Sequence, residues 1–151
     1  MYEFLLFVHV LAAVIWVGGG FALNVVGTRL VGASNSDAMA GFARQVEFIG
    51  QRIFAPVSGL LFLVGVFMTL DRWSFKDLWI AIGVVGFLYA AITGAAIIGP
   101  LAARTGKLVE ERGPTDSRVI ANIRKLFLFG RIELLVMIVV IAAMTMKPTL
   151  G

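Results

Sequence analysis

The sequence predicts an all-α membrane protein in which four transmembrane helices form a bundle. Hydrophobic residues make up 60% of the 151 residues and charged residues 15%, whereas soluble domains are about half apolar and about a quarter charged. Four apolar stretches are long enough for membrane-spanning helices, which need about 20 residues each. We expect one transmembrane domain to occupy the whole chain, residues 1–151.

The four spans follow from these stretches in order along the chain. Long polar connections, about residues 28–52 and 102–125, separate the first two and the last two spans. Each connection begins with turn-forming residues and continues as an amphipathic pattern, which predicts a helix leading into the next span. Gly86, Ala90 and Gly94 recur at four-residue spacing in the third span, which predicts close helix packing. The spans are expected at about residues 4–27, 53–70, 78–101 and 126–146.

Basic residues indicate how the bundle is oriented. Ten of the 13 Lys and Arg residues lie in or beside the two long connections. Because basic residues mark the cytoplasmic side, both termini are expected outside, in a multi-pass protein of the bacterial inner membrane. The basic residues that mark the cytoplasmic side thus account for the net charge of +4. The expected partner is the lipid bilayer, and no nucleic acid is expected.

Polar residues on the first span form the first candidate site. The spacing of His9, Trp16 and Asn24 places them on one face of this helix, and an ionisable group inside a membrane is a functional candidate. Tyr89, in the third span, is a candidate hydrogen-bond partner that would fix the tautomer of His9. Together these four residues are the predicted cofactor-binding group. The alternative is a neutral histidine that bonds to a neighbouring helix and does nothing further.

Methionines supply possible metal ligands. Met68, Met144 and Met146 are expected in the same outer third of the bundle as His9. Imidazole with thioethers suits Cu(I), and a His/Met pair also holds haem iron. The alternative is that these methionines only fill gaps in apolar helices. Because the chain has one histidine and no cysteine, a second strong ligand must be a methionine, a cofactor or another subunit.

A second polar group lies toward the cytoplasmic side. It consists of Arg52, Arg131 and Glu133. Ion pairing at the helix entrances is the first interpretation, because an unpaired carboxylate near hydrocarbon is costly. A proton relay through Glu133 is the alternative.

The first span also carries a family resemblance. The stretch LFVHVLAAVIWVGGGFAL resembles the opening helix of the CopD-like superfamily, which includes the copper-resistance membrane protein CopD, HemJ-type protoporphyrinogen oxidases and a branch of small four-span membrane proteins. The chain is most similar to that last branch. The resemblance implies a helical bundle in which His9 is a candidate ligand of haem b or copper.

Three functional hypotheses follow. The first is a haem- or copper-associated redox or accessory protein that uses His9. The second is a non-catalytic structural or assembly subunit, a homo-oligomer or part of a larger membrane complex, built on surfaces of small residues. The third is a transporter of a small solute or proton along His9, Asn24 and Glu133. Whether the protein is an enzyme is left open.

Overall fold

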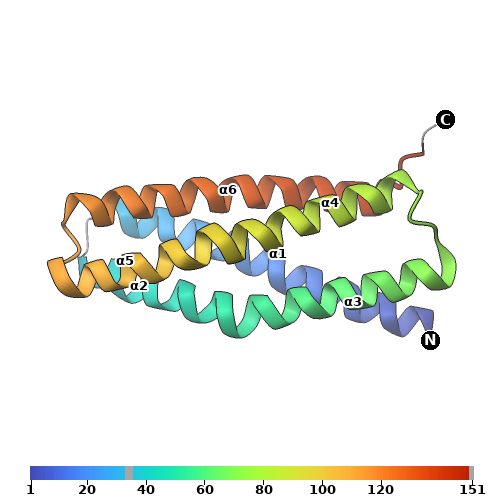
Figure 1. Cartoon of the computed structure of the whole chain (residues 1–151), viewed down its shortest axis with the longest axis horizontal. Coiled ribbons are helices and arrows are strands. Elements are labelled where there is room, and N and C mark those ends of the chain that lie inside the picture. Colours follow the sequence, from blue (N-terminus) through green and yellow to red (C-terminus); the bar gives the residue numbers. More distant parts are fainter. Residues whose placement is uncertain (33–35, 150–151) are drawn as a thin grey trace.

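The computed structural model describes residues 1–32 and 36–149, and within them every regular element is helical. Four continuous helices are long and apolar enough to cross a membrane, so the predicted all-α bundle of four spans is confirmed (Figure 1). The first continuous helix is α1 (Tyr2–Gly32) and the fourth is α6 (Ser117–Met146). The second consists of α2 (Ser36–Ile49), η1 (Gly50–Phe54) and α3 (Ala55–Arg72). The third consists of α4 (Leu78–Thr93), η2 (Gly94–Ile98) and α5 (Gly99–Arg112).

The helices are longer than a bilayer requires. The 30 residues of α6 correspond to about 45 Å, against about 30 Å for the hydrocarbon core. Both termini lie at one end of the bundle, which we call the terminal end, and the connection at residues 113–116 lies at the other, the loop end (Figure 1). Much of the two long connections expected at 28–52 and 102–125 is therefore helical, as a direct continuation of the spans.

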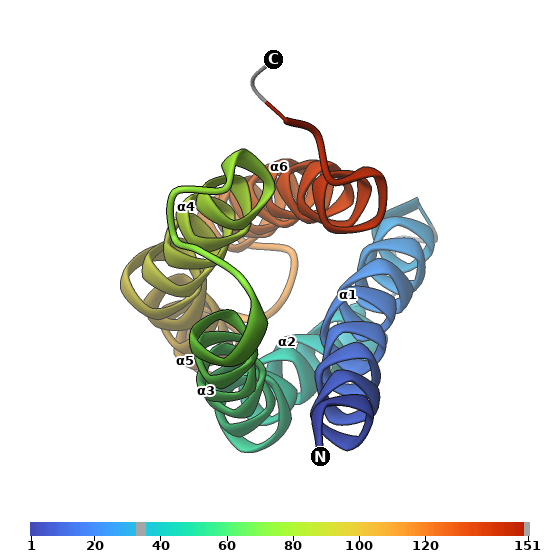
Figure 2. The same cartoon turned by 90° about the vertical axis from the view of Figure 1, so that its right-hand side faces the viewer.

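The four continuous helices surround a common axis. Viewed from the terminal end, their order around the ring is α1, α3, α4 and α6 (Figure 2). The most extensive packing joins α1 to α3 and α4 to α6, while α2 packs on α5 near the loop end. Much of the outward surface carries exposed apolar side chains, such as Phe7, Val14 and Leu135, which suits contact with lipid.

Two π-helical turns interrupt the second and third continuous helices, each just before a proline. Proline lacks the backbone N–H and its ring clashes with the carbonyl four residues earlier, so a regular α-helix cannot continue through it unchanged. Here the residue before each proline donates its N–H five residues back, from Ala55 to the Gly50 carbonyl and from Gly99 to the Gly94 carbonyl. The widened turns keep both helices continuous through Pro56 and Pro100.

The interior contains two separate apolar cores. The core nearer the terminal end joins all four continuous helices and includes Trp16, whose ring meets Phe87 edge-on with centroids 5.7 Å apart. The core nearer the loop end is built from α5 and α6 around Val119, which is fully buried. The buried members of the first core are Ala12, Trp16, Leu61, Ala90 and Met137, and those of the second are Val109, Val119 and Ile123.

An aromatic cluster closes the terminal end. Trp73 and Trp79 meet edge-on with ring centroids 5.0 Å apart, and Trp73 donates its indole N–H to the Tyr2 hydroxyl at 3.2 Å. Lys147 places its ammonium 4.2 Å from the Trp73 ring centroid, and Arg72 lies 4.3 Å from that of Tyr2. These contacts join the start of α1, the α3–α4 connection and the end of α6.

Candidate functional site

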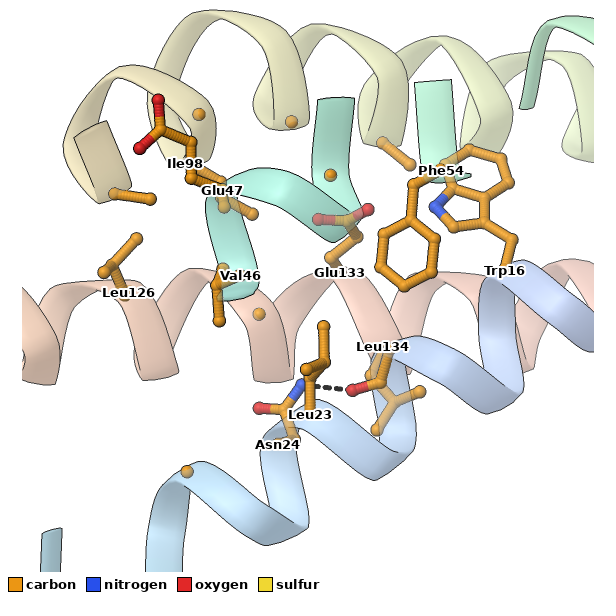
Figure 3. Close-up of a pocket in the computed structure, with 18 of the residues that line it drawn as sticks. Trp16, Leu23, Asn24, Val46, Glu47, Phe54, Ile98, Leu126, Glu133 and Leu134 are labelled. Carbon is orange, nitrogen blue, oxygen red and sulfur yellow. Dashed lines mark hydrogen bonds between the residues drawn. The ribbon is translucent and has the colours of Figure 1, made fainter. Parts of the chain in front are cut away.

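A cavity of about 750 Å³ lies between the two cores. Protein interiors are normally close-packed, whereas a hollow of about 300–1,000 Å³ is typical of small-molecule sites. Side chains from all four continuous helices line it, and most of them are apolar or small (Figure 3). The polar or charged side chains in its wall are Asn24, Glu47, Gln51, Ser58 and Glu133.

Aromatic rings border the cavity toward both cores. Trp16 and Phe54 lie on the side of the terminal end (Figure 3). On the side of the loop end, Phe42 stacks on Phe127 with ring centroids 6.3 Å apart. A Cβ atom at Gly27 would collide with both of these rings, so a glycine is needed where α1 passes over them.

Glycines at the π turns contribute to the open space. Gly50 and Gly94 begin η1 and η2, and both line the cavity. A Cβ atom built on Gly94 would meet no other atom within 4 Å, and the same holds at Gly20 on α1. The absence of side chains at these glycines therefore leaves space in the wall of the cavity.

Glu133 is the acidic group placed deepest in the cavity. It lies on α6 thirteen residues before Met146, about 20 Å from that end of the helix. Its carboxylate points into the hollow between the level of Glu47 and the rings of Trp16 and Phe54 (Figure 3). Within the described residues it has no hydrogen-bond or ion-pair partner.

The two arginines predicted beside Glu133 are exposed and have other surroundings. Arg131 donates from Nη2 to the Thr28 hydroxyl at 3.3 Å, and Arg52 lies on the exposed surface of η1. The ion pairs in the described part of the chain are Arg44–Glu110 and Arg72–Asp71. The structure therefore places the predicted polar group at one level of the bundle without pairing its charges.

Asn24 contributes a second polar group with an unused oxygen. Its side-chain amide donates to the Gly20 carbonyl at 3.0 Å, whereas the buried Oδ1 atom has no hydrogen-bond partner among the residues that the structure describes. The side chain packs against Gly130, whose added Cβ would lie 3.2 Å from Nδ2. Of the predicted site residues, the structure thus brings Trp16, Asn24 and Glu133 to one cavity.

His9 lies outside this cavity, between α1 and α3. Its Nδ1 atom is 3.1 Å from the Leu61 carbonyl, and its Cε1 atom would lie 3.0 Å from a Cβ added at Gly65. Tyr89 is half-exposed and makes no hydrogen bond to His9 in the described structure. The histidine therefore bonds to a neighbouring helix, and Leu61, not Tyr89, is its partner.

The three predicted thioether ligands have different surroundings. Met68 is buried on the face of α3 that carries Leu61 and Gly65. Met144 places its methyl group against Gly83 at the α4–α6 contact, and Met146 is 80% exposed. Of the three, Met68 alone shares a helix face with the contacts of His9. The described residues also contain no group of three or more His, Asp or Glu side chains that could hold a metal ion.

Three further polar residues of the cavity, Glu47, Gln51 and Ser58, were not among the predicted site residues. Gln51 donates from Nε2 to the Glu47 carboxylate at 3.4 Å, across one turn at the junction of α2 and η1. The available signal was Pro56, five residues after Gln51, because a proline inside an apolar helix marks an irregular turn. That signal does not indicate which side chains face the interior.

Comparison with known proteins identifies one family. The model of the family described as predicted integral membrane protein (DUF2269) matches residues 3–148. No curated protein and no solved structure matches the chain. The match supports a membrane-protein family and does not extend to the CopD-like superfamily, which stays a prediction.

Proposed function

The chain belongs to the DUF2269 family of predicted integral membrane proteins, and we propose that it binds a lipid-soluble small molecule inside its four-helix bundle. The observation that carries this proposal is the 750 Å³ cavity between the two cores. Its volume and largely apolar wall match the general character of small-molecule sites. Lipid, aromatic and isoprenoid-like compounds are the chemical classes that fit such a wall.

Polar groups in the wall would orient the ligand. The unpartnered Asn24 Oδ1 and the Glu133 carboxylate are both acceptors. A buried acceptor without a partner costs about 1–3 kcal/mol, and a ligand donor placed here would remove that cost. A hollow of this size with two acceptors in its wall therefore supports the binding of a small molecule.

A neutral fluorescent probe tests this function. We expect 9-anthracenemethanol to quench Trp16 by energy transfer in protein held in nanodiscs, with Trp73 and Trp79 both replaced by phenylalanine. Gly94→Leu places a side chain in open space at the cavity wall and should abolish quenching. Gly59→Leu is the matched control, because Gly59 also has open space around its Cβ position but does not line the cavity. Equal quenching in both variants would contradict the proposal.

A second candidate function, haem or copper association through His9, is favoured by one contact. Histidines that bind metals commonly donate one ring N–H to a carbonyl, which leaves the other nitrogen as the ligand. Nδ1 of His9 lies 3.1 Å from the Leu61 carbonyl, so Nε2 would be the ligating atom. Met68 on the same face of α3, or a residue of another chain, would supply the second ligand.

Absorbance and metal content test the second candidate. Protein purified with added haem or Cu(I) should retain the group, and His9→Gln should lose it. Met68→Leu should weaken retention if the second ligand comes from the same chain. A wild-type protein that retains neither haem nor copper would exclude this candidate and leave the cavity proposal unaffected.

We also propose that the loop end faces the cytoplasm of a bacterial cell, with both termini outside. The excess of Lys and Arg at the loop end supports this orientation. Membership of a homo-oligomer or of a larger membrane complex is compatible with the exposed apolar faces. Such an assembly would supply a second ligand for His9 but is not needed to complete the cavity.

A further inference from the structure

We propose that the molecule held in the cavity is a lipophilic cation, an amine whose ammonium group pairs with the Glu133 carboxylate. This inference rests on the proposed binding function and specifies the class of ligand. Its basis is the charge of the cavity wall, the aromatic rings beside the carboxylate and the unused acceptor on Asn24.

The charged side chains in the described part of the wall are both acidic. They are Glu47 and Glu133, and the described lining residues include no Lys, Arg or His. An isolated carboxylate in a medium of low dielectric constant is costly, and a bound cation offsets that cost. The two nearby basic side chains do not pair with Glu133 in the described structure, because Arg131 bonds to Thr28 and Arg52 lies on the exposed surface. A cationic ligand would supply the counter-ion that Glu133 lacks in the described structure.

Glu133 is a better candidate for this role than Glu47. Glu47 already accepts a hydrogen bond from Gln51 and lies toward the loop end of the cavity (Figure 3). Glu133 has no such partner in the described structure and lies deeper between the cores. An anionic ligand is disfavoured in either position, because it would be repelled by both carboxylates.

Aromatic rings and an amide oxygen complete the environment of a cation. Trp16 and Phe54 both lie on one side of the Glu133 carboxylate, toward the terminal end (Figure 3). Faces of aromatic rings attract cations, and tryptophan does so most strongly. Asn24 Oδ1, which is buried and has no donor, is available to an ammonium N–H. An ammonium with an apolar body therefore matches the wall better than a neutral compound of the same shape.

A matched pair of probes tests the charge of the ligand. 9-(Aminomethyl)anthracene is a cation at pH 7, and 9-anthracenemethanol is its neutral counterpart of nearly equal size. Binding is measured in nanodiscs of zwitterionic lipid by quenching of Trp16, in the same background without Trp73 and Trp79. The wild-type cavity should bind the amine at least about tenfold more tightly than the alcohol, as expected for a desolvated charge pair.

Substitutions of Glu133 test whether its carboxylate causes the preference for the amine over the alcohol. Glu133→Gln should remove about tenfold of affinity for the amine and a smaller part of the affinity for the alcohol, because the glutamine amide keeps an acceptor for the hydroxyl and loses only the charge. Glu133→Asp keeps the charge and should retain the preference for the amine, which guards against a simple folding defect. Glu111→Gln, at an exposed carboxylate at the end of α5, is the matched control and should change neither affinity.

The possible failures are distinguishable. Equal affinity for amine and alcohol in the wild type, or an unchanged preference in Glu133→Gln, would overturn the cation inference while leaving the binding function intact. Absence of binding of both probes to the wild type would overturn both proposals. A loss of amine preference in Glu47→Gln, with Glu133→Gln unaffected, would overturn the assignment to Glu133.

Discussion

At the scale of single residues, Asn24 combines one satisfied and one unsatisfied hydrogen-bonding group in the wall of the cavity. Its Nδ2 bonds to the carbonyl of its own helix, and its buried Oδ1 bonds to nothing. A hydrogen bond contributes about 1 kcal/mol, whereas an unsatisfied buried acceptor costs about 1–3 kcal/mol. By this balance the side chain contributes little net stability.

Replacing Asn24 by leucine tests that interpretation. We expect Asn24→Leu to melt at the same temperature as the wild type or higher, because the loss of one bond is offset by removal of an unsatisfied oxygen. Affinity for 9-(aminomethyl)anthracene should fall. Thermal unfolding and probe titration of the same nanodisc sample measure both quantities. A variant that melts well below the wild type would show that Asn24 is structural.

Residue patterns predicted part of the site. The spacing along α1 correctly put Trp16 and Asn24 on the face that points inward, and both line the cavity with Glu133. His9 lies on α1 seven residues nearer the terminal end than Trp16, which is about 10 Å along the helix. At the level of His9, the core and the α1–α3 contact fill the interior. Helical periodicity identifies a face but does not reveal where along that face the packing opens.

At the scale of elements, two glycines of α4 pack against different kinds of side chain. Gly83 faces the flexible methyl end of Met144, whereas Gly86 faces the branched side chain of Val140. The sequence predicted close packing of α4 from Gly86, Ala90 and Gly94, but only Gly86 and the buried Ala90 occupy tight positions, since Gly94 faces open space.

Alanine substitutions distinguish the two contacts. Gly86→Ala should destabilise the bundle by about 1–3 kcal/mol, as expected when a methyl group is forced into a packed interface. Gly83→Ala should cost less, because the Met144 side chain can adopt another rotamer. Unfolding by denaturant in mixed micelles provides the comparison. A larger loss at Gly83 than at Gly86 would contradict the packing described for α4 and α6.

The long helices were predictable from composition, but their π turns were not. Apolar runs of sufficient length identify spans, and Pro56 and Pro100 indicate irregularity within them. A proline can end a helix, kink it or widen one turn, and the outcome depends on the helices packed around it. In this bundle both prolines follow widened turns that line the same cavity.

At the scale of the whole molecule, orientation in the membrane follows from charge. The bundle has an even number of spans and both termini at one end (Figure 1). The aromatic cluster of Trp73 and Trp79 at that end is typical of a membrane interface. Because the basic residues gather at the loop end, the terminal end is expected outside.

Single cysteines measure this orientation, because the chain contains none of its own. A membrane-impermeant maleimide should label Phe75→Cys in intact bacterial cells, since Phe75 is exposed at the terminal end. Thr115→Cys, in the exposed connection at the loop end, should be labelled only after the cells are opened. The reverse pattern would invert the proposed orientation without affecting the cavity.

The cavity itself could not be predicted from the sequence. Its wall is assembled from all four continuous helices, and Phe54, Phe42 and Phe127 line it where they pack beside them. Such long-range packing is a property of the whole bundle. Composition predicts a bundle of apolar helices, but it does not distinguish a filled interior from a hollow one.

Occupancy of the cavity in the protein as it comes from the cell is the central claim. Native mass spectrometry of the protein, extracted into nanodiscs from its own membrane, measures it directly. We predict a bound small amine of defined mass on the wild type and on Gly59→Leu, and its loss from Gly94→Leu. Identical masses for all three proteins, each corresponding to the bare chain, would contradict the account.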